Sequence, residues 1–143
     1  MSNKYGHDIT TCFLTPIVAF LSIVYLGTFP GVLISLGFVF AGFMFNGDLD
    51  CHSSPYTRWL FLRFLWIPYR WFGSHRSLIS HGPVIGTVVR VLWLAGIFVI
   101  AAIWFIPVPV MVAFCTVHWQ SICYVLAGLE LGAASHYVND WIT

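Results

Sequence analysis

The sequence predicts an all-α protein: a polytopic membrane bundle of about four transmembrane helices, with an interfacial helix in the loop 47–83. The chain of 143 residues is 59% hydrophobic and only 8% charged, whereas soluble domains carry about 25% charged residues. Its mean hydropathy is +0.88, and long apolar runs follow one another along the sequence. At this length we expect a single membrane domain, residues 1–143.

The first two apolar runs predict a helical hairpin through the bilayer. Residues 12–27 and residues 31–46 are each short for a span of about 20 residues, but both can extend into their flanks. The segment 28–31 between them (TFPG) is a turn signal. Pro16 lies near the start of the first run, where a helix tolerates proline best.

The segment Ser53–Phe72 mixes arginines with aromatic and aliphatic residues. Its arginines are Arg58, Arg63 and Arg70. Aromatic rings and long cationic side chains both favour the membrane–water interface, so the segment predicts an interfacial helix rather than a span. We expect Pro68 to break or kink this helix.

Residues 84–106 form the clearest transmembrane helix, with Arg90 as their single charge. Pro107 then separates this helix from the last apolar run, residues 108–134. The polar group 118–121 (HWQS) leaves open whether the last run crosses the membrane once or breaks there.

Two charges, Arg90 and Glu130, lie inside predicted spans. Buried charges in a membrane usually find each other, so we expect these two side chains to pair. Together with His118 they would also be the polar path of a metal or proton transporter. That path is too sparse for transport to be the preferred function.

Four spans would place both termini and the loop 47–83 on one side of the membrane. The basic residues fall on that side, and the short loops near 28–30 and 106–109 carry none: Lys4, Arg58, Arg63, Arg70 and Arg76. The positive-inside rule makes this side cytoplasmic. We therefore expect a multi-pass protein of an inner, plasma or thylakoid membrane, with its termini and its site on the cytoplasmic side.

Charge and cysteine content narrow the partners. A net charge of +1 without a basic run argues against nucleic acid, so the expected partners are membrane lipids and, alternatively, a larger membrane complex. The cysteines show no CxxC or zinc-finger spacing: Cys12, Cys51, Cys115 and Cys123. Three lie in apolar context and are expected to pack as small buried hydrophobes. Only Cys51, between Asp50 and His52, stays open as a ligand.

Scarce polar residues gather at the four helix ends expected on the cytoplasmic side. The chain has five acidic residues and six histidines, and most of them occur there. They are His7 and Asp8 before the first helix, Asp48, Asp50 and His52 after the second, His75 and His81 before the third, and His136 and Asp140 at the end of the fourth. Taken singly, each group also has a structural interpretation, such as an acidic turn or a helix cap. Together at one membrane surface, where polar groups are costly, they favour metal binding.

Histidine mixed with aspartate suits one or two divalent transition ions, with zinc first and manganese or iron as alternatives. Several carboxylates favour two ions, because a carboxylate can bridge them. Such a site would activate water for attack at phosphorus or a carbonyl carbon. Arg76 is expected to bind an anionic group of the substrate, and Ser77 and Ser80 are candidates for orienting the histidines.

The motif order makes the chain similar to a known family. His-Asp near the N-terminus is followed by Gly-Asp-Leu-Asp-Cys-His (47–52), His-Arg-Ser-Leu-Ile-Ser-His-Gly (75–82) and a late His-x-x-x-Asp (136–140). This order resembles the DUF2227 metal-binding membrane proteins, a type common in cyanobacteria, over nearly the whole chain. It is more distantly similar to the YdjM-like inner-membrane metal-dependent hydrolases. The resemblance implies a cytoplasmic-face metal site with these ligands: His7, Asp48, Asp50, His75, His81, His136 and Asp140, with His52 and Asp8 as further candidates.

The function we expect is that of a membrane-embedded metal-dependent hydrolase acting on a lipid or lipid-linked phosphoester. The site would open at headgroup depth, beside an interfacial segment rich in aromatics and arginines. Asp50 and Arg76 are the expected catalytic residues, with Arg76 steadying the anionic substrate while an activated water attacks. The alternative is a non-catalytic metal-binding subunit or assembly factor of a larger membrane complex, in which protein donors fill every coordination position.

Overall fold

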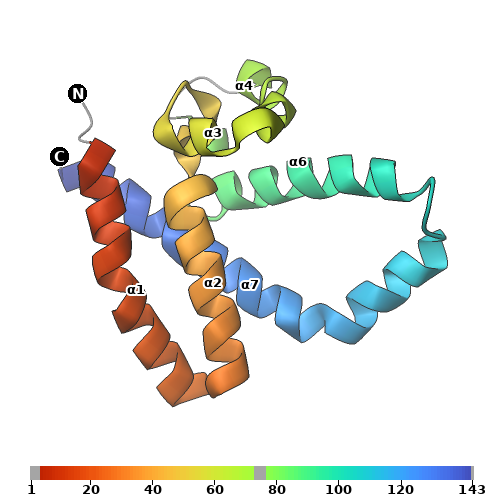
Figure 1. The fold of residues 1–143 in the computed structure, drawn as a ribbon, viewed down its shortest axis with the longest axis horizontal. Coiled ribbons are helices and arrows are strands. Elements are labelled where there is room, and N and C mark those ends of the chain that lie inside the picture. The colour runs from red at the N-terminus through yellow and green to blue at the C-terminus, as the bar shows by residue number, and fades with distance from the viewer. Residues whose placement is uncertain (1–3, 73–76, 143) are drawn as a thin grey trace.

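The computed structural model describes residues 4–72 and 77–142, and every regular element in those ranges is a helix (Figure 1). The all-α prediction is therefore confirmed. In chain order the elements are α1 (Lys4–Leu26), α2 (Thr28–Met44), the 3-10 helix η1 (Gly47–Asp50), α3 (Ser54–Arg58), the 3-10 helix η2 (Leu60–Trp66), α4 (Tyr69–Phe72), α5 (Leu78–His81), α6 (Ile85–Ala102) and α7 (Val108–Ile142).

Within the described residues, three helical stretches are long and apolar enough to cross a membrane: Gly6–Leu26, Ile85–Ala102 and Val108–Trp141. The helix Thr28–Met44 is apolar but shorter. These helices confirm a polytopic helical architecture. Both termini lie at the end of the molecule that also carries the segment between α2 and α6 (Figure 1), as the predicted topology requires.

The first hairpin turns at Gly27 rather than within residues 28–31. Gly27 has a φ of 93°, a left-handed conformation that glycine adopts without steric strain. Pro30 lies in the first turn of α2, where its missing N–H disturbs no helical hydrogen bond. At the other end, α1 begins at Lys4 instead of residue 12, which places His7 on the helix itself.

Glycines let α2 and α7 pack at short distance. A Cβ atom added to Gly128 would collide with the carbonyl oxygen of Ile34, and one added to Gly132 would collide with that of Phe38. The two glycines are four residues apart on α7 and therefore share a face. Small residues spaced in this way allow close helix packing in membrane proteins, and this contact brings the end of α2 next to the last turns of α7.

The segment predicted as one interfacial helix is divided into α3, η2 and α4. Leu60, the first residue of η2, has a positive φ of 51°, and Pro68 precedes α4. Some of its aromatic rings turn inward, with Trp66 5.1 Å from Trp59 and 5.5 Å from Tyr69 between ring centroids. Others stay exposed, such as Trp71. Because of these breaks the segment can pack a small core over η1 and still present aromatic residues outward.

The last apolar run is one unbroken helix. α7 continues from Val108 to Ile142 through His118, which is exposed, so no break occurs at the polar group. Its 35 residues correspond to about 52 Å at 1.5 Å per residue. In Figure 1, α6 and the first half of α7 spread away from α1 and α2 and approach each other again at residues 103–107.

The expected Arg90–Glu130 ion pair is wrong. Fully buried Arg90 donates to the carbonyl oxygen of Ser80 at 2.6 Å, the Thr87 hydroxyl at 3.0 Å and the Tyr137 hydroxyl at 2.8 Å. Glu130 accepts from the backbone N–H of Val84 at 2.9 Å. Oxygens of α5, α6 and α7 thus accept from both terminal nitrogens of the guanidinium, and Glu130 caps the α6 N-terminus, where a negative charge is favourable.

The prediction of buried cysteines is wrong as well. Cys12, Cys115 and Cys123 are exposed on α1 and α7, among large exposed hydrophobic residues such as Phe13 and Phe114. In a water-soluble protein, a cysteine among apolar residues is usually buried. On a helix that is apolar on every side, such a cysteine also occurs on an outward face.

Candidate metal centre

Three helical elements bring histidine and aspartate side chains together at one point. Within the described residues, Asp48, His81, His136 and Asp140 each offer one ligand atom, and these atoms lie within 4.8 Å of one another. They come from η1, from α5 and, for the last two, from α7. We call these four residues the His/Asp cluster.

His136 is the centre of the His/Asp cluster. Its Nε2 lies 3.4 Å from Oδ2 of Asp48 and 3.4 Å from Oδ2 of Asp140. The other oxygen of Asp48, Oδ1, lies 3.4 Å from Nε2 of His81. Asp48 therefore spans the two histidines, in the way a bridging carboxylate does.

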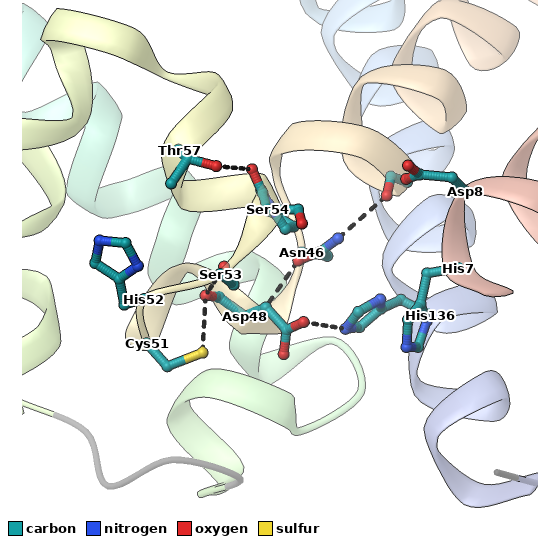
Figure 2. Close-up of a pocket in the computed structure, with 12 residues that line it drawn as sticks. His7, Asp8, Asn46, Asp48, Cys51, His52, Ser53, Ser54, Thr57 and His136 are labelled. Atoms are coloured by element: carbon teal, nitrogen blue, oxygen red, sulfur yellow. Dashed lines mark hydrogen bonds and ion pairs between the residues drawn. The ribbon is translucent and has the colours of Figure 1, made fainter. Parts of the chain in front are cut away.

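Asn46 and Ser53 hold the backbone around Asp48. Asn46, fully buried, accepts from the Asp48 N–H at 3.2 Å and donates to the Gly42 carbonyl at 3.1 Å. The Ser53 hydroxyl donates to the Asp48 carbonyl at 2.7 Å. Figure 2 shows both contacts, with the Asp48 carboxylate pointing to His136. Asn46 acts as the N-cap of η1 and so fixes the direction of that carboxylate.

Asp48 is ionised. Burial by itself raises the pKa of the Asp48 carboxyl, but its hydrogen bonds with His136 and His81 outweigh that effect and hold the pKa far below the ordinary value. Next to it, burial and the charges of Asp48 and Asp50 raise the pKa of the Cys51 thiol to about 12. Cys51 is therefore a protonated thiol, and its Sγ donates to the Asp48 carbonyl, which agrees with a packing role.

Asp50 lies behind His81, on the side away from Asp48. Its Oδ2 is 3.7 Å from Nδ1 of His81, and Ser80 Oγ is 3.0 Å from the same nitrogen. Partners at Nδ1 fix the tautomer and orientation of an imidazole whose Nε2 faces a metal. The structure thus brings Asp50, expected as a direct ligand, to a position that orients a ligand, and puts Ser80 in the orienting place expected for it.

Gly47 allows His81 to approach η1. A Cβ at this position would lie 2.9 Å from Nε2 of His81, closer than real side chains come. Steric crowding therefore explains the glycine in the Gly-Asp-Leu-Asp sequence. A side chain at Gly47 would displace the His81 imidazole from the His/Asp cluster.

His7 reaches the cluster from α1. Its Nε2 lies 3.2 Å from Oδ1 of Asp140, and its ring centroid is 4.2 Å from that of His136. Its Nδ1 lies 3.1 Å from Nδ2 of Asn139. The predicted ligand His7 is thus adjacent to the four clustered residues and contacts Asp140 through the oxygen that does not face His136.

The other predicted site residues lie elsewhere. Asp8 pairs through both oxygens with the guanidinium of Arg58. His52 is exposed, with its ring 5.6 Å from that of Tyr56. His75 and Arg76 lie outside the described residues, so their roles as ligand and anion-binding residue stay predictions.

The arrangement fits a divalent transition metal. A tetrahedral ion with ligands at about 2.0–2.1 Å holds its donor atoms about 3.3 Å apart, close to the 3.4 Å separations around His136. In the described part of the chain, Nε2 of buried His136 has no hydrogen-bond partner and faces the carboxylates of Asp48 and Asp140. Imidazole nitrogens and ionised carboxylate oxygens are the donors that zinc, manganese and iron accept.

A cavity of about 440 Å³ opens beside the cluster. Asp48, His136 and His7 line it on one side, and polar residues of the segment after η1 line the other, among them Ser53, Ser54 and Thr57 (Figure 2). This volume lies in the range of small-molecule sites. The partly exposed carboxylate of Asp48 is therefore accessible to a substrate-sized molecule, whereas Nε2 of His81 and Nε2 of His136 are buried behind it.

Sequence reasoning missed the residues that hold the ligands in place. Asn46 carried a usable signal, because an asparagine directly before a short turn is a frequent N-cap. No signal in the sequence indicated Asn139 or Tyr137. Their contacts with His7 and Arg90 depend on which faces of α7 meet α1 and α6.

Comparisons with known proteins agree with this chemistry. A family model described as "Uncharacterized metal-binding protein (DUF2227)" matches residues 4–143. An "Uncharacterized protein" of Aquifex aeolicus (strain VF5) is 43% identical over 60 residues, which make up 41% of this chain and 42% of that protein. The match thus spans about two fifths of the length of this relative. No solved structure matches the chain.

Proposed function

Since the chain belongs to the DUF2227 family of metal-binding proteins, we propose that it is a membrane-embedded metal-dependent hydrolase. Its substrate is a lipid or lipid-linked phosphoester, and its site faces the cytoplasm. Zinc is the preferred ion, with manganese or iron as alternatives, because both nitrogen and oxygen donors are present.

One observation carries this proposal: the His/Asp cluster forms part of the wall of the 440 Å³ cavity. A purely structural site would be enclosed by protein, whereas here Asp48 and His136 line an accessible space. Substrate and water can therefore reach the Asp48 carboxylate, one of the groups that would hold the ion.

The residues of this chain have distinct roles in the proposed reaction. A bound divalent ion would supply Lewis acidity, lowering the pKa of water and neutralising charge on the phosphoryl group. Asp48 and His136 hold the ion, and Asp50 with Ser80 keeps Nε2 of His81 directed at it. As the oxygen of water bonds to phosphorus and the P–O ester bond breaks, His7, positioned by Oδ1 of Asp140, takes the water proton and returns it to the leaving oxygen.

The membrane placement rests on length, composition and charge. Three helical stretches have the length and apolar character of spans. The expected cytoplasmic side carries Arg58, Arg63 and Arg70 together with both termini. The cluster lies at that same end, where the proposed topology puts the headgroup phosphates.

The test compares two histidines of the same helix. Protein in nanodiscs is loaded with zinc or manganese, and its metal content and turnover of phosphatidic acid and of lipid diphosphates are measured. His136→Ala should lose bound metal and turnover, because its Nε2 contacts two cluster carboxylates, while the matched control His118→Ala should keep both. Equal turnover in the two variants would exclude this site as the catalytic centre.

One observation favours the non-catalytic alternative, a metal-binding subunit of a larger membrane complex. Asp48, His81, His136 and Asp140 supply four donors, enough to complete a tetrahedral shell. X-ray absorption spectroscopy of the loaded protein distinguishes the two functions. A shell of four protein donors without water favours the structural role, and a coordinated water favours the hydrolase.

A further inference from the structure

The His/Asp cluster also borders another cavity, of about 320 Å³. His81 and Asp140 line this cavity, whereas Asp48 and His136 line the first one. Among the described residues, the two cavities have no lining residue in common. The four clustered side chains therefore form a wall with one cavity on each side.

The two cavities differ in chemistry. Opposite the cluster, the first is lined by hydroxyl and carboxylate groups, those of Ser54, Thr57 and Asp8. Opposite the cluster, the other is lined by Leu78, Pro83 and Trp141. Leu78 is 71% exposed and Trp141 is 90% exposed, so this apolar rim is not part of the packed interior.

The apolar rim lies where two candidate spans reach the membrane surface. Leu78 belongs to α5, directly before α6, and Trp141 lies in the last turn of α7. Val84 and Ile85 next to them are also exposed. Tryptophan and aliphatic side chains at the ends of spans are typical of the boundary between headgroups and acyl chains, so the apolar rim of this cavity suits that boundary, while the first cavity is bordered by polar residues.

We propose that the cavity at Leu78 and Trp141, which we call the chain subsite, binds the first part of the hydrocarbon chain of an amphiphilic phosphoester. The polar headgroup lies in the 440 Å³ cavity, the phosphorus lies at the cluster between them, and the chain leaves past Leu78 and Trp141 into the bilayer. This assignment rests on the proposed function. It adds to that function the place where the hydrocarbon chain binds, and it requires a chain attached next to the phosphate.

The experiment uses a long-chain alkyl phosphonate with a diazirine near the phosphonate end, irradiated with the zinc-loaded protein in nanodiscs. The expected labels lie at Leu78, Pro83 and Trp141. Chelation of zinc should abolish them, and excess unlabelled long-chain phosphonate should compete, whereas methylphosphonate should compete only at much higher concentration. Labels elsewhere on α6 and α7 should not depend on zinc, because they report lipid-facing surface only.

Two tryptophans provide matched variants. Trp141→Ala should weaken binding of the long-chain phosphonate about tenfold, the value of roughly two lost methylene contacts. Trp104→Ala, at a similarly exposed tryptophan beyond the end of α6, should have no effect. Trp104→Ala should also leave turnover of a water-soluble aryl phosphate unchanged, since Trp104 lines neither cavity.

The outcomes separate this inference from the proposed function. Zinc-dependent labelling at the chain subsite without turnover of any phosphoester supports the subsite and contradicts the hydrolase. Turnover with labelling that is spread over α6 and α7 and independent of zinc supports the hydrolase and overturns the subsite. An equal effect of Trp141→Ala and Trp104→Ala overturns the subsite as well.

Discussion

At the scale of residues, Asp48 and Asp50 differ although the sequence places them in one motif. They belong to a 3-10 helix, in which each residue advances by about 120°. Two residues apart, their side chains point in different directions, so Asp48 meets His81 and His136 while Asp50 lies behind His81. Sequence spacing predicted that both would be near the metal. It could not predict their different roles, because these depend on the type of turn.

This difference gives a ranked prediction for metal affinity. Asp50→Asn should weaken zinc binding by about 10–100-fold, the usual effect of changing a residue that orients a ligand. Asp48→Asn should weaken it further, because the change removes a donor atom. Competition with a fluorescent zinc chelator measures both affinities. Asp8→Asn is the matched control and should keep wild-type affinity, since Asp8 pairs with Arg58; the reverse order of Asp48 and Asp50 would contradict the geometry.

Arg90 joins three parts of the chain. It donates to Ser80 before α6, to Thr87 within α6 and to Tyr137 on α7. Arg90→Met should reduce the free energy of unfolding by about 3 kcal/mol, because it leaves buried oxygens without donors. Arg63→Met, at an exposed arginine, should change it by less than about 0.5 kcal/mol. Steric-trapping or denaturation measurements in detergent would show the difference, and similar losses in both variants would contradict this role.

At the scale of elements, the glycines of α7 determine whether the ligands can meet. The sequence predicted the helices, but the close contact of α2 with α7 depends on which faces carry Gly128 and Gly132, and the polar clusters alone did not indicate this. The same limit explains the wrong Arg90–Glu130 pair. Helical spans were predictable from composition, whereas the rotation of each helix about its axis was not.

This packing can be tested with two glycines in different surroundings. Gly132→Val should lower the free energy of unfolding by at least about 2 kcal/mol and weaken zinc binding, because α2 would be pushed away from α7. Gly96→Val in α6 should be close to neutral for zinc binding, since nothing lies within 4 Å of its added Cβ. Thermal unfolding and zinc titration of both variants provide the measurement. Unchanged zinc affinity in Gly132→Val would show that metal binding does not depend on the close contact of α2 with α7.

At the scale of the whole molecule, the convergence of four helix ends was predictable. Charge placement assigned both termini and the loop 47–83 to one side, and scarce polar residues in an apolar chain indicated a site there. The structure brings His7, Asp48, His81, His136 and Asp140 together at that end. Pro68 predicted the break before α4, but nothing in the composition predicted the break at Leu60, which depends on a positive φ at that residue.

The proposed orientation in the membrane, with the loop 47–83 on the cytoplasmic side, gives a prediction for the intact protein. In a cysteine-free background, Thr57→Cys and Ile106→Cys should react with a membrane-impermeant maleimide from opposite sides of the membrane. Thr57 should react from the cytoplasmic side, because it lies in the arginine-bearing segment. Labelling in inverted vesicles and in intact cells provides the comparison. Reaction of both cysteines from the same side would exclude the four-span topology.

The unbroken length of α7 links bilayer thickness to the chemistry of the site. At about 52 Å, the helix is longer than the roughly 30 Å hydrocarbon layer that it would cross, so its tilt adjusts to hydrophobic mismatch. His136 and Asp140 lie near its end, whereas Asp48 and His81 belong to other elements. A thinner or thicker membrane would therefore move one half of the cluster relative to the other, and lipid chain length would modulate the zinc affinity of this protein.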